Sequence, residues 1–215
     1  VTGTNDAPIV EDVVTSADED GAAVTASFDG SDADSDDDAS TLTYVITSSP
    51  SEGSVANNGD GTFSFVPGAG FQDLAEGETR DVTFGYTATD SHGAVSNTGT
   101  VTVTVTGTND TPVVEAVSAA ADEDGAAVIG SFVGSDADSD DDGATLSYSI
   151  VSSPSEGSVA NNGDGTFSFD PGADFQDLAQ GETRDVTFGY SATDSRGAVS
   201  SSGLVTVTVT GTNDA

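Results

Sequence analysis

The chain has no cysteine, methionine, tryptophan or lysine, and its three basic residues are Arg80, Arg184 and Arg196. Without cysteine, neither a disulfide nor a thiolate metal site is possible. Binding to nucleic acid or to an anionic membrane depends on Lys and Arg, so neither is an expected partner. No apolar run approaches the roughly 18 residues of a membrane span, so direct membrane insertion is not expected either.

Residues that commonly catalyse reactions are also scarce. The chain holds one histidine, His92, and the equivalent position in the second half of the sequence is Arg196. General acid–base and nucleophilic catalysis usually draw on histidine, cysteine or a cluster of such groups. We therefore expect a protein that is not an enzyme.

Acidic residues dominate the charge. The 38 acidic residues give a formal net charge of -35, and 29 of them are aspartate. Aspartate favours turns and loops over helices, so the carboxylates should gather where strands are connected. One interpretation is a solvated acidic surface of a salt-adapted protein. The recurrence of the acids in loops of both halves favours the other interpretation, which is cation binding.

The sequence repeats itself. The pentapeptide TGTND begins at Thr2, Thr106 and Thr210, a spacing of 104 residues, and the two copies differ at 22 of 104 positions. A period of this length predicts two tandem domains of one fold. We assign residues 1–106 to the first, with a linker motif at 1–7. Residues 107–215 form the second, with linkers at 107–111 and 210–215.

Alternating apolar and polar residues predict short strands rather than helices. In the first copy the expected strands are 9–17, 22–28, 41–48, 54–56, 62–66, 82–88 and 100–106. One helical turn is expected within 71–79. The expected core residues are Phe28, Tyr44, Phe63, Phe65, Phe71, Phe84 and Tyr86. The fold class is all-β, with two tandem seven-stranded immunoglobulin-like Greek-key sandwiches.

If the seven strands alternate in direction, every loop falls at one of two ends of its sandwich. The N-terminal end would gather Asn5 and Asp6, the acidic loop 32–38, the hairpin 57–61 and Asp90. The opposite end would gather the acidic turn 18–20, the loop 73–78 and the linker residues Asn109 and Asp110. Stacked copies would bring acids from two ends together. Oxygen ligands in this number suit Ca²⁺, which takes six to eight of them.

Particular motifs then point to a family. GTNDAP (3–8) and GTNDTP (107–112), each followed by an ADEDG turn, a DxD loop, an NGDGTFSF hairpin and a YxATDxxG turn, resemble the VCBS and cadherin-like repeats of RTX-type bacterial adhesins. This resemblance implies calcium between successive domains. By resemblance, the matching residues are Glu19, Glu78, Asn109, Asp110, Asp136, Asp138 and Asp194.

Applying these roles and the acidic turns to both copies gives the full set of predicted calcium ligands. They are Asn5, Asp6, Asp18, Glu19, Asp20, Asp32, Asp34, Glu78, Asp90, Asn109, Asp110, Asp122, Glu123, Asp124, Asp136, Asp138, Glu182, Asp194, Asn213 and Asp214. In the NNGDG hairpins, Asp60 and Asp164 have either a turn role or an ion-binding role.

The functional hypothesis is an extracellular stalk on a bacterial cell surface. Calcium ions and adjacent repeats of the same chain are the expected partners, the chain is expected to be monomeric, and a distal domain would do the binding. One alternative is a calcium-dependent carbohydrate- or protein-binding module, although tryptophan platforms are lacking. Another is homophilic adhesion of the animal cadherin kind, where strand exchange relies on a buried tryptophan.

Overall fold

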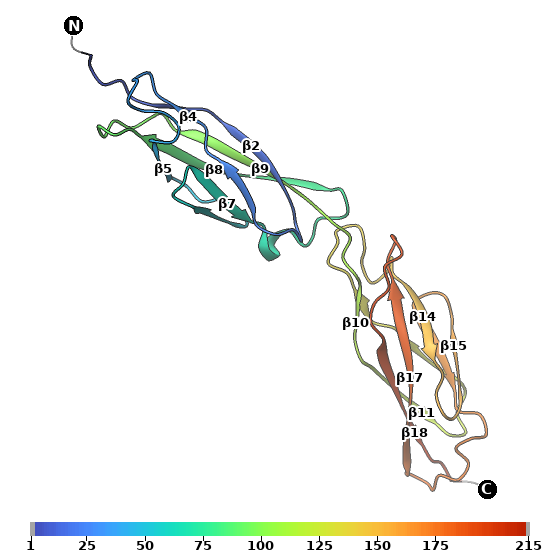
Figure 1. The fold of residues 1–215 in the computed structure, drawn as a ribbon. Coiled ribbons are helices and arrows are strands. Elements are labelled where there is room, and N and C mark those ends of the chain that lie inside the picture. The colour runs from blue at the N-terminus through green and yellow to red at the C-terminus, as the bar shows by residue number, and fades with distance from the viewer. Residues whose placement is uncertain (1–2, 214–215) are drawn as a thin grey trace. The chain divides into compact units, whose positions relative to one another are not determined.

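The computed structural model describes residues 3–213, which form two compact units divided between Thr108 and Asn109. Each unit is an all-β sandwich (Figure 1). The strands of the first unit are β1 (Ile9–Val10), β2 (Val13–Asp18), β3 (Val24–Ser27), β4 (Gly30–Ser31), β5 (Thr43–Ile46), β6 (Ser54–Asn57), β7 (Thr62–Val66), β8 (Thr79–Thr89) and β9 (Gly99–Thr106). Those of the second are β10 (Val113–Val114), β11 (Val117–Asp122), β12 (Val128–Ser131), β13 (Gly134–Ser135), β14 (Ser147–Ser152), β15 (Ser158–Asn161), β16 (Thr166–Asp170), β17 (Thr183–Thr193) and β18 (Gly203–Thr210).

The two units share one topology. In the first, a four-stranded sheet has the order β2-β9-β8-β5, and a three-stranded sheet has the order β3-β7-β6. The second repeats this with β11-β18-β17-β14 and β12-β16-β15. Strand β2 pairs in parallel with β9, and β11 pairs in parallel with β18, whereas the other strand pairs of each unit are antiparallel. The expected all-β sandwich is therefore confirmed in both copies.

The first expected strand, 9–17, is divided in two. Strand β1 pairs with β4, and β2 pairs with the last strand, β9. Glu11 and Asp12 lie between them, because the chain leaves one sheet edge to join the other. The hydroxyl of Tyr86 fixes this crossing by donating to the carbonyl of Glu11 at 2.5 Å and to that of Asp29 at 2.9 Å.

The expected helical turn lies earlier than predicted. The helix found among residues 3–213 is the 3-10 helix η1 (Gly68–Phe71), which starts after Pro67 and overlaps the predicted segment only at Phe71. Proline is suited to the start of a helix because its φ is already fixed near the helical value. In the described part of the chain, no helix has the length and apolarity that a membrane crossing needs.

The core of the first unit matches the expectation. All seven predicted aromatic residues are buried, with exposed fractions of 5% or less. Phe28 stacks on Tyr44 at a centroid distance of 5.0 Å, and Phe63 meets Phe84 edge-on at 5.2 Å. The second unit repeats these contacts with Phe132, Tyr148, Phe167 and Phe188. Such pairs rigidify the sandwich from which the loops project.

One tyrosine hydroxyl is satisfied in the second unit and not in the first. Tyr148 donates to the carbonyl of Gly143 at 3.2 Å, whereas the equivalent hydroxyl of Tyr44 is buried without a hydrogen-bond partner. The first unit has Ala39 where the second has Gly143, and a Cβ on Gly143 would lie 2.9 Å from the carbonyl oxygen of Gly134. Glycine therefore lets the second loop approach its tyrosine.

The glycine of TGTND is required by close packing at the end of the first unit. A Cβ on Gly107 would lie 2.3 Å from the carbonyl oxygen of Ala75 and 2.5 Å from that of Leu74. The Gly107 N–H donates to the carbonyl of Glu78 at 2.8 Å, and its own carbonyl accepts from Gly77 at 3.0 Å. These contacts seat the linker against the loop that precedes β8.

The tyrosine pair predicts unequal effects of one substitution. Tyr148→Phe should lower the free energy of unfolding by about 1 kcal/mol, because a satisfied buried hydrogen bond is lost. Tyr44→Phe should leave stability unchanged or raise it slightly, because the removed hydroxyl has no partner. Urea denaturation of the full chain measures both effects. Equal losses in the two variants would contradict this explanation.

The packing of Gly107 predicts a second difference. Gly107→Ala should destabilise the first unit by roughly 1–3 kcal/mol, because the added methyl group overlaps two carbonyl oxygens. Gly3→Ala is the matched control, since a Cβ at the same position of the first TGTND motif meets nothing within 4 Å. Thermal unfolding compares the two variants. If both unfold at the same temperature, the close contact does not control stability.

Candidate metal centre

The N-terminal end of the second unit is a network of carboxylates and one amide. The Asn109 side-chain amide donates to the Asp194 carboxylate at 2.9 Å. The Asp110 N–H donates to Asp138 Oδ2 at 2.9 Å, and the Asp138 N–H donates to Asp136 Oδ1 at 3.1 Å. The linker, the loop after β13 and the turn after β17 therefore meet here, as the sorting of loops by end predicted.

Several oxygens of this network are buried and accept no hydrogen bond. They are Asn109 Oδ1, Asp136 Oδ2 and Asp138 Oδ1. Asp138 is 2% exposed, so solvent does not compensate its charge. Buried polar atoms almost always have a partner, and a buried charge without one is costly. Carboxylate and amide oxygens of this kind are the ligand type that Ca²⁺ accepts, so the residues present fit that ion by chemical type.

The first unit repeats the network at its own N-terminal end. The Asn5 amide donates to Asp90 Oδ2 at 2.8 Å, and the Asp6 N–H donates to Asp34 Oδ2 at 2.7 Å. The Asp34 N–H donates to Asp32 Oδ1 at 2.8 Å, and Asp32 Oδ2 is buried without a hydrogen-bond partner. The same residue types thus build the same arrangement twice.

Electrostatics differ among these carboxylates. Burial raises the pKa of Asp138, and the neighbouring charges of Asp136 and Asp110 raise it further. The hydrogen bond from Asn5 lowers the pKa of Asp90, helped by the N–H groups of Ala94 and His92. A nearby cation would therefore favour the ionised form of Asp138, whereas Asp90 is held ionised by donors.

Asp194 is also held ionised. Burial opposes its negative charge, but hydrogen bonds from the Asn109 amide and from the Ala198 N–H outweigh burial and lower its pKa. The Asn109 amide nitrogen is committed to this contact and to the carbonyl of Asp110 at 2.7 Å. The oxygen of the same amide remains as an acceptor for a cation.

The opposite end of each unit presents one buried glutamate. Glu19 is 3% exposed and Glu123 is 1% exposed. Glu19 Oε1 accepts from the Thr108 N–H at 2.7 Å, and Glu123 Oε1 accepts from the Thr212 N–H at 2.7 Å. Glu123 Oε2 is buried and accepts no hydrogen bond. Each glutamate therefore fastens the departing linker while carrying a buried charge.

The aspartates on either side of these glutamates are exposed. Asp20 accepts from Gln72 at 2.9 Å and from the Thr108 hydroxyl at 3.2 Å, and Asp124 makes the matching contacts with Gln176 and Thr212. The side chains of Asp18 and Asp122 end their strands on the exposed side. In each DED turn, the structure buries the central residue alone.

The remaining predicted ligands are less enclosed. Glu78 and Glu182 are exposed, and their carboxylates accept from the N–H groups of Ala75 at 3.2 Å and Ala179 at 3.1 Å. Asn213 is exposed, and Asp214 lies outside the described residues. Asp60 Oδ1 accepts from the Thr62 N–H and hydroxyl at 3.1 and 2.6 Å, which is the turn role.

Sequence reasoning missed two buried aspartates at equivalent positions, Asp37 in the first unit and Asp141 in the second. Each is 5% exposed. Asp37 accepts from the Ser91 hydroxyl at 2.8 Å, and Asp141 accepts from that of Ser195 at 2.7 Å, so each ties its acidic loop to the turn before the last strand. Both aspartates recur in the two copies, but the neighbouring aspartates of the loop recur as well. Recurrence alone therefore does not single out the buried residue.

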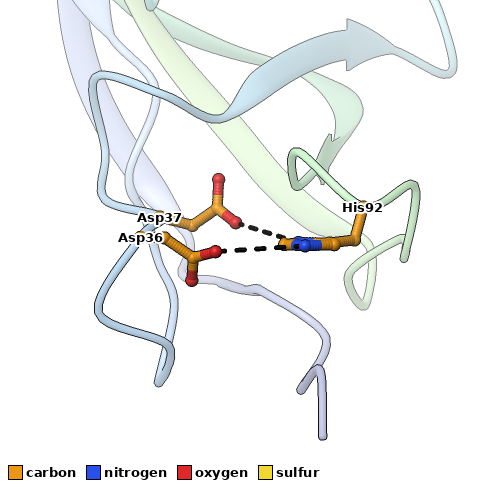
Figure 2. A group of neighbouring side chains, drawn as sticks. All are labelled: Asp36, Asp37 and His92. Atoms are coloured by element: carbon orange, nitrogen blue, oxygen red, sulfur yellow. Dashed lines mark ion pairs between the residues drawn. The ribbon is translucent and has the colours of Figure 1, made fainter. Parts of the chain in front are cut away.

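A separate cluster of the first unit contains nitrogen as well as oxygen. His92 Nε2 lies 3.9 Å from Asp36 Oδ2, and His92 Nδ1 lies 3.8 Å from Asp37 Oδ2 (Figure 2). In the second unit the guanidinium of Arg196 reaches Asp140 at 3.0 Å instead. The two copies thus differ in what faces the acidic loop.

The other two arginines pair with neighbouring carboxylates. Arg80 contacts Asp73 at 2.8 Å and Glu52 at 3.3 Å, and Arg184 contacts Asp177 at 2.7 Å. These contacts raise the pKa of Arg80, chiefly through the hydrogen bond to Asp73. Both arginines therefore anchor the strand before the last one rather than neutralise the predicted calcium ligands.

Comparison with known proteins gives the same fold. No curated protein sequence matches the chain. Among solved structures, Drosophila N-cadherin EC1-4 has 15% identity and a TM-score of 0.54 over 97% of this chain and 50% of that chain. Mouse clustered PcdhgC3 EC1-3 has 13% identity and a TM-score of 0.49 over 96% and 68%. The likeness to N-cadherin supports the fold alone, and this chain spans about half the length of that fragment.

A family model for the bacterial cadherin-like domain matches residues 5–107 and again residues 109–211. These two matches fall within the two units described above. They account for the repeat and for the sandwich topology that the two units share. The chain therefore belongs to the bacterial cadherin-like domain family, of which it contains two tandem copies.

Proposed function

We propose that these two domains are extender repeats of a large secreted bacterial adhesin, stiffened by calcium and without enzymatic activity. They would project a distal binding domain from the cell surface. The observation that supports the proposal is the set of buried oxygens that accept no hydrogen bond at the ends of the second unit, on Asn109, Asp136, Asp138 and Glu123. Tandem domains of a cadherin-like family are typical of extracellular adhesion and stalk modules.

The chemistry of these oxygens selects the ion. They belong to carboxylates and one amide, with no thiolate or imidazole among them. Calcium takes six to eight such oxygens at about 2.3–2.6 Å, whereas magnesium demands a stricter octahedron and keeps more of its water. The predicted ligands around them, including Asp110 and Glu78, would supply further oxygens.

The charge of the chain supports an ion from solution. The protein has 38 acidic residues and three arginines, and each arginine pairs with carboxylates outside the predicted ligand set. No lysine is present to serve instead. The negative charge at the buried ends therefore has to be offset by a cation that the chain does not carry.

The connection between the units explains how an ion would add stiffness. Thr108 is held by Glu19 at the end of the first unit, and the next residue, Asn109, is held by Asp194 in the second. The proposed ligands at the end of the first unit and those at the start of the second are thus attached to consecutive residues. An ion that draws ligands from both removes the freedom of the peptide that joins them.

Calcium would also stabilise each domain by mass action. An ion that binds the folded chain alone contributes about 2.7 kcal/mol when its free concentration is a hundred times the dissociation constant. A repeat whose stability depends on this binding free energy folds where calcium is abundant, and calcium is abundant outside cells. Many such repeats in series would form a stalk whose stiffness follows the calcium concentration.

Distances between the units test this function directly. The chain has no cysteine, so Val14→Cys in β2 and Ile129→Cys in β12, both at highly exposed positions, can carry spin labels without background. We expect a narrow distance distribution in millimolar calcium and a broad one after chelation. Without calcium, the hinge between the units, the peptide that joins Thr108 to Asn109, is unrestrained. Pulsed electron paramagnetic resonance measures both distributions.

Two matched variants make the test specific. Asp138→Asn removes one proposed ligand charge beside the hinge and should broaden the distribution in calcium. Asp34→Asn makes the same change at the equivalent position of the first unit, away from the hinge, and should leave it narrow. A distribution that is equally broad with and without calcium would refute the proposed function.

A further inference from the structure

The cluster around His92 is built differently from the oxygen-only ends. Figure 2 shows the carboxylates of Asp36 and Asp37 approaching the imidazole ring from the same side. The two contacts measure 3.9 Å to Nε2 and 3.8 Å to Nδ1. One ring nitrogen and one oxygen from each carboxylate lie within 4.8 Å of one another. An ion placed among them would meet nitrogen as well as oxygen.

Asp37 is held in place before any ligand arrives. Its side chain is fully buried and accepts from the Ser91 N–H at 3.1 Å, the Ser91 hydroxyl at 2.8 Å and the Thr41 hydroxyl at 3.2 Å. The backbone N–H of His92 donates to Asp90 Oδ1 at 2.9 Å, which fixes the turn that carries the ring. Groups that orient a ligand in this way usually raise metal affinity.

The second unit keeps the hydrogen bonds that hold the buried aspartate but has no histidine beside it. Asp141 accepts from the Ser195 and Thr145 hydroxyls at 2.7 and 3.1 Å, as Asp37 does in the first unit. Arg196 replaces the histidine, and its guanidinium contacts Asp140 at 3.0 Å. A guanidinium has no lone pair to give to a metal, and its positive charge repels one. The second unit is therefore a natural control.

We propose that His92, Asp36 and Asp37 form a binding site for a borderline divalent metal ion such as Zn²⁺, present in the first unit and absent from the second. Imidazole suits zinc, copper and nickel, whereas calcium selects oxygen. The site is thus chemically separate from the proposed calcium ligands.

The geometry requires the ligands to close around the ion. Tetrahedral zinc with bonds of about 2.0–2.2 Å places its ligand atoms roughly 3.3–3.6 Å apart. The set of one ring nitrogen and one oxygen from each carboxylate lies within 4.8 Å. The side chains of His92 and Asp36 are 55% and 62% exposed, so they are free to close this gap around fixed Asp37. Asp36 and His92 line an open groove together with Ser35 and with the predicted calcium ligands Asn5 and Asp34, so solvent can reach the site.

The competing explanation is electrostatic. A protonated His92 would pair with Asp36 and Asp37 as Arg196 pairs with Asp140, without a metal. The two explanations differ in the response to added zinc, which a metal site would bind and an ion pair would not. They also differ in the effect of arginine at this position, which preserves an ion pair and removes a ligand.

Zinc titration of the full chain tests the site. In millimolar calcium above neutral pH, calorimetry should give one zinc equivalent per chain, and zinc should shift the imidazole NMR signals, which come from the one histidine in the sequence. His92→Arg and Asp36→Asn should each weaken zinc binding at least about ten-fold. Arg196→His should create a second equivalent.

Asp140→Asn is the matched control, because it makes the Asp36 change in the unit that lacks the histidine. It should leave zinc binding unaltered, and thermal unfolding should confirm that every variant folds. Zinc affinity that survives His92→Arg, imidazole signals that do not shift, or no binding at millimolar zinc would each overturn the proposal.

Discussion

The enclosure of carboxylates at the two ends of the second domain is the constraint on which the proposed calcium sites depend. Glu123 and Asp138 are almost fully enclosed, and each has one oxygen that accepts no hydrogen bond. Enclosing a carboxylate is costly unless a cation or several donors compensate it. The aromatic cores pack the sandwiches from which these carboxylates project, so the fold determines where the enclosed oxygens lie.

The sequence was sufficient to predict the sandwich and its core. Alternation in segments such as Val82 to Ala88 and Val101 to Val105 predicts half-buried strands, and the structure has β8 and β9 there. The division of the first strand was not predictable, because β1 and β2 are separated only by a change of pairing partner. Pairing is a long-range property that local alternation does not encode.

The candidate site was predictable as a set of loops but not atom by atom. Sorting acids by end grouped Asn5 with Asp90 and Asp6 with Asp34, and the structure joins both pairs by hydrogen bonds. It could not show that in each DED turn the central glutamate alone is buried, because burial depends on how the linker is seated by Gly107 and Thr108. Nor could it separate Asp37 from its neighbours, since its role depends on Ser91, 54 residues away.

Comparison of the two copies shows which residues are the same in both units and which differ. The acids of the proposed calcium ends are the same in both units, while Ala39 and His92 become Gly143 and Arg196. The first change alters a single tyrosine hydrogen bond, and the second changes which ion the loop can hold. One framework therefore accepts different chemistry beside a constant set of oxygen ligands.

The most direct measurement of the central claim is a high-resolution crystal structure of the chain grown in millimolar calcium. If these residues bind calcium, we expect an ion bonded to Asn109 Oδ1, Asp136 Oδ2 and Asp138 Oδ1 at about 2.3–2.6 Å. Ordered water at ordinary hydrogen-bond distances of about 2.7–3.0 Å from these same atoms, with no ion, would contradict it.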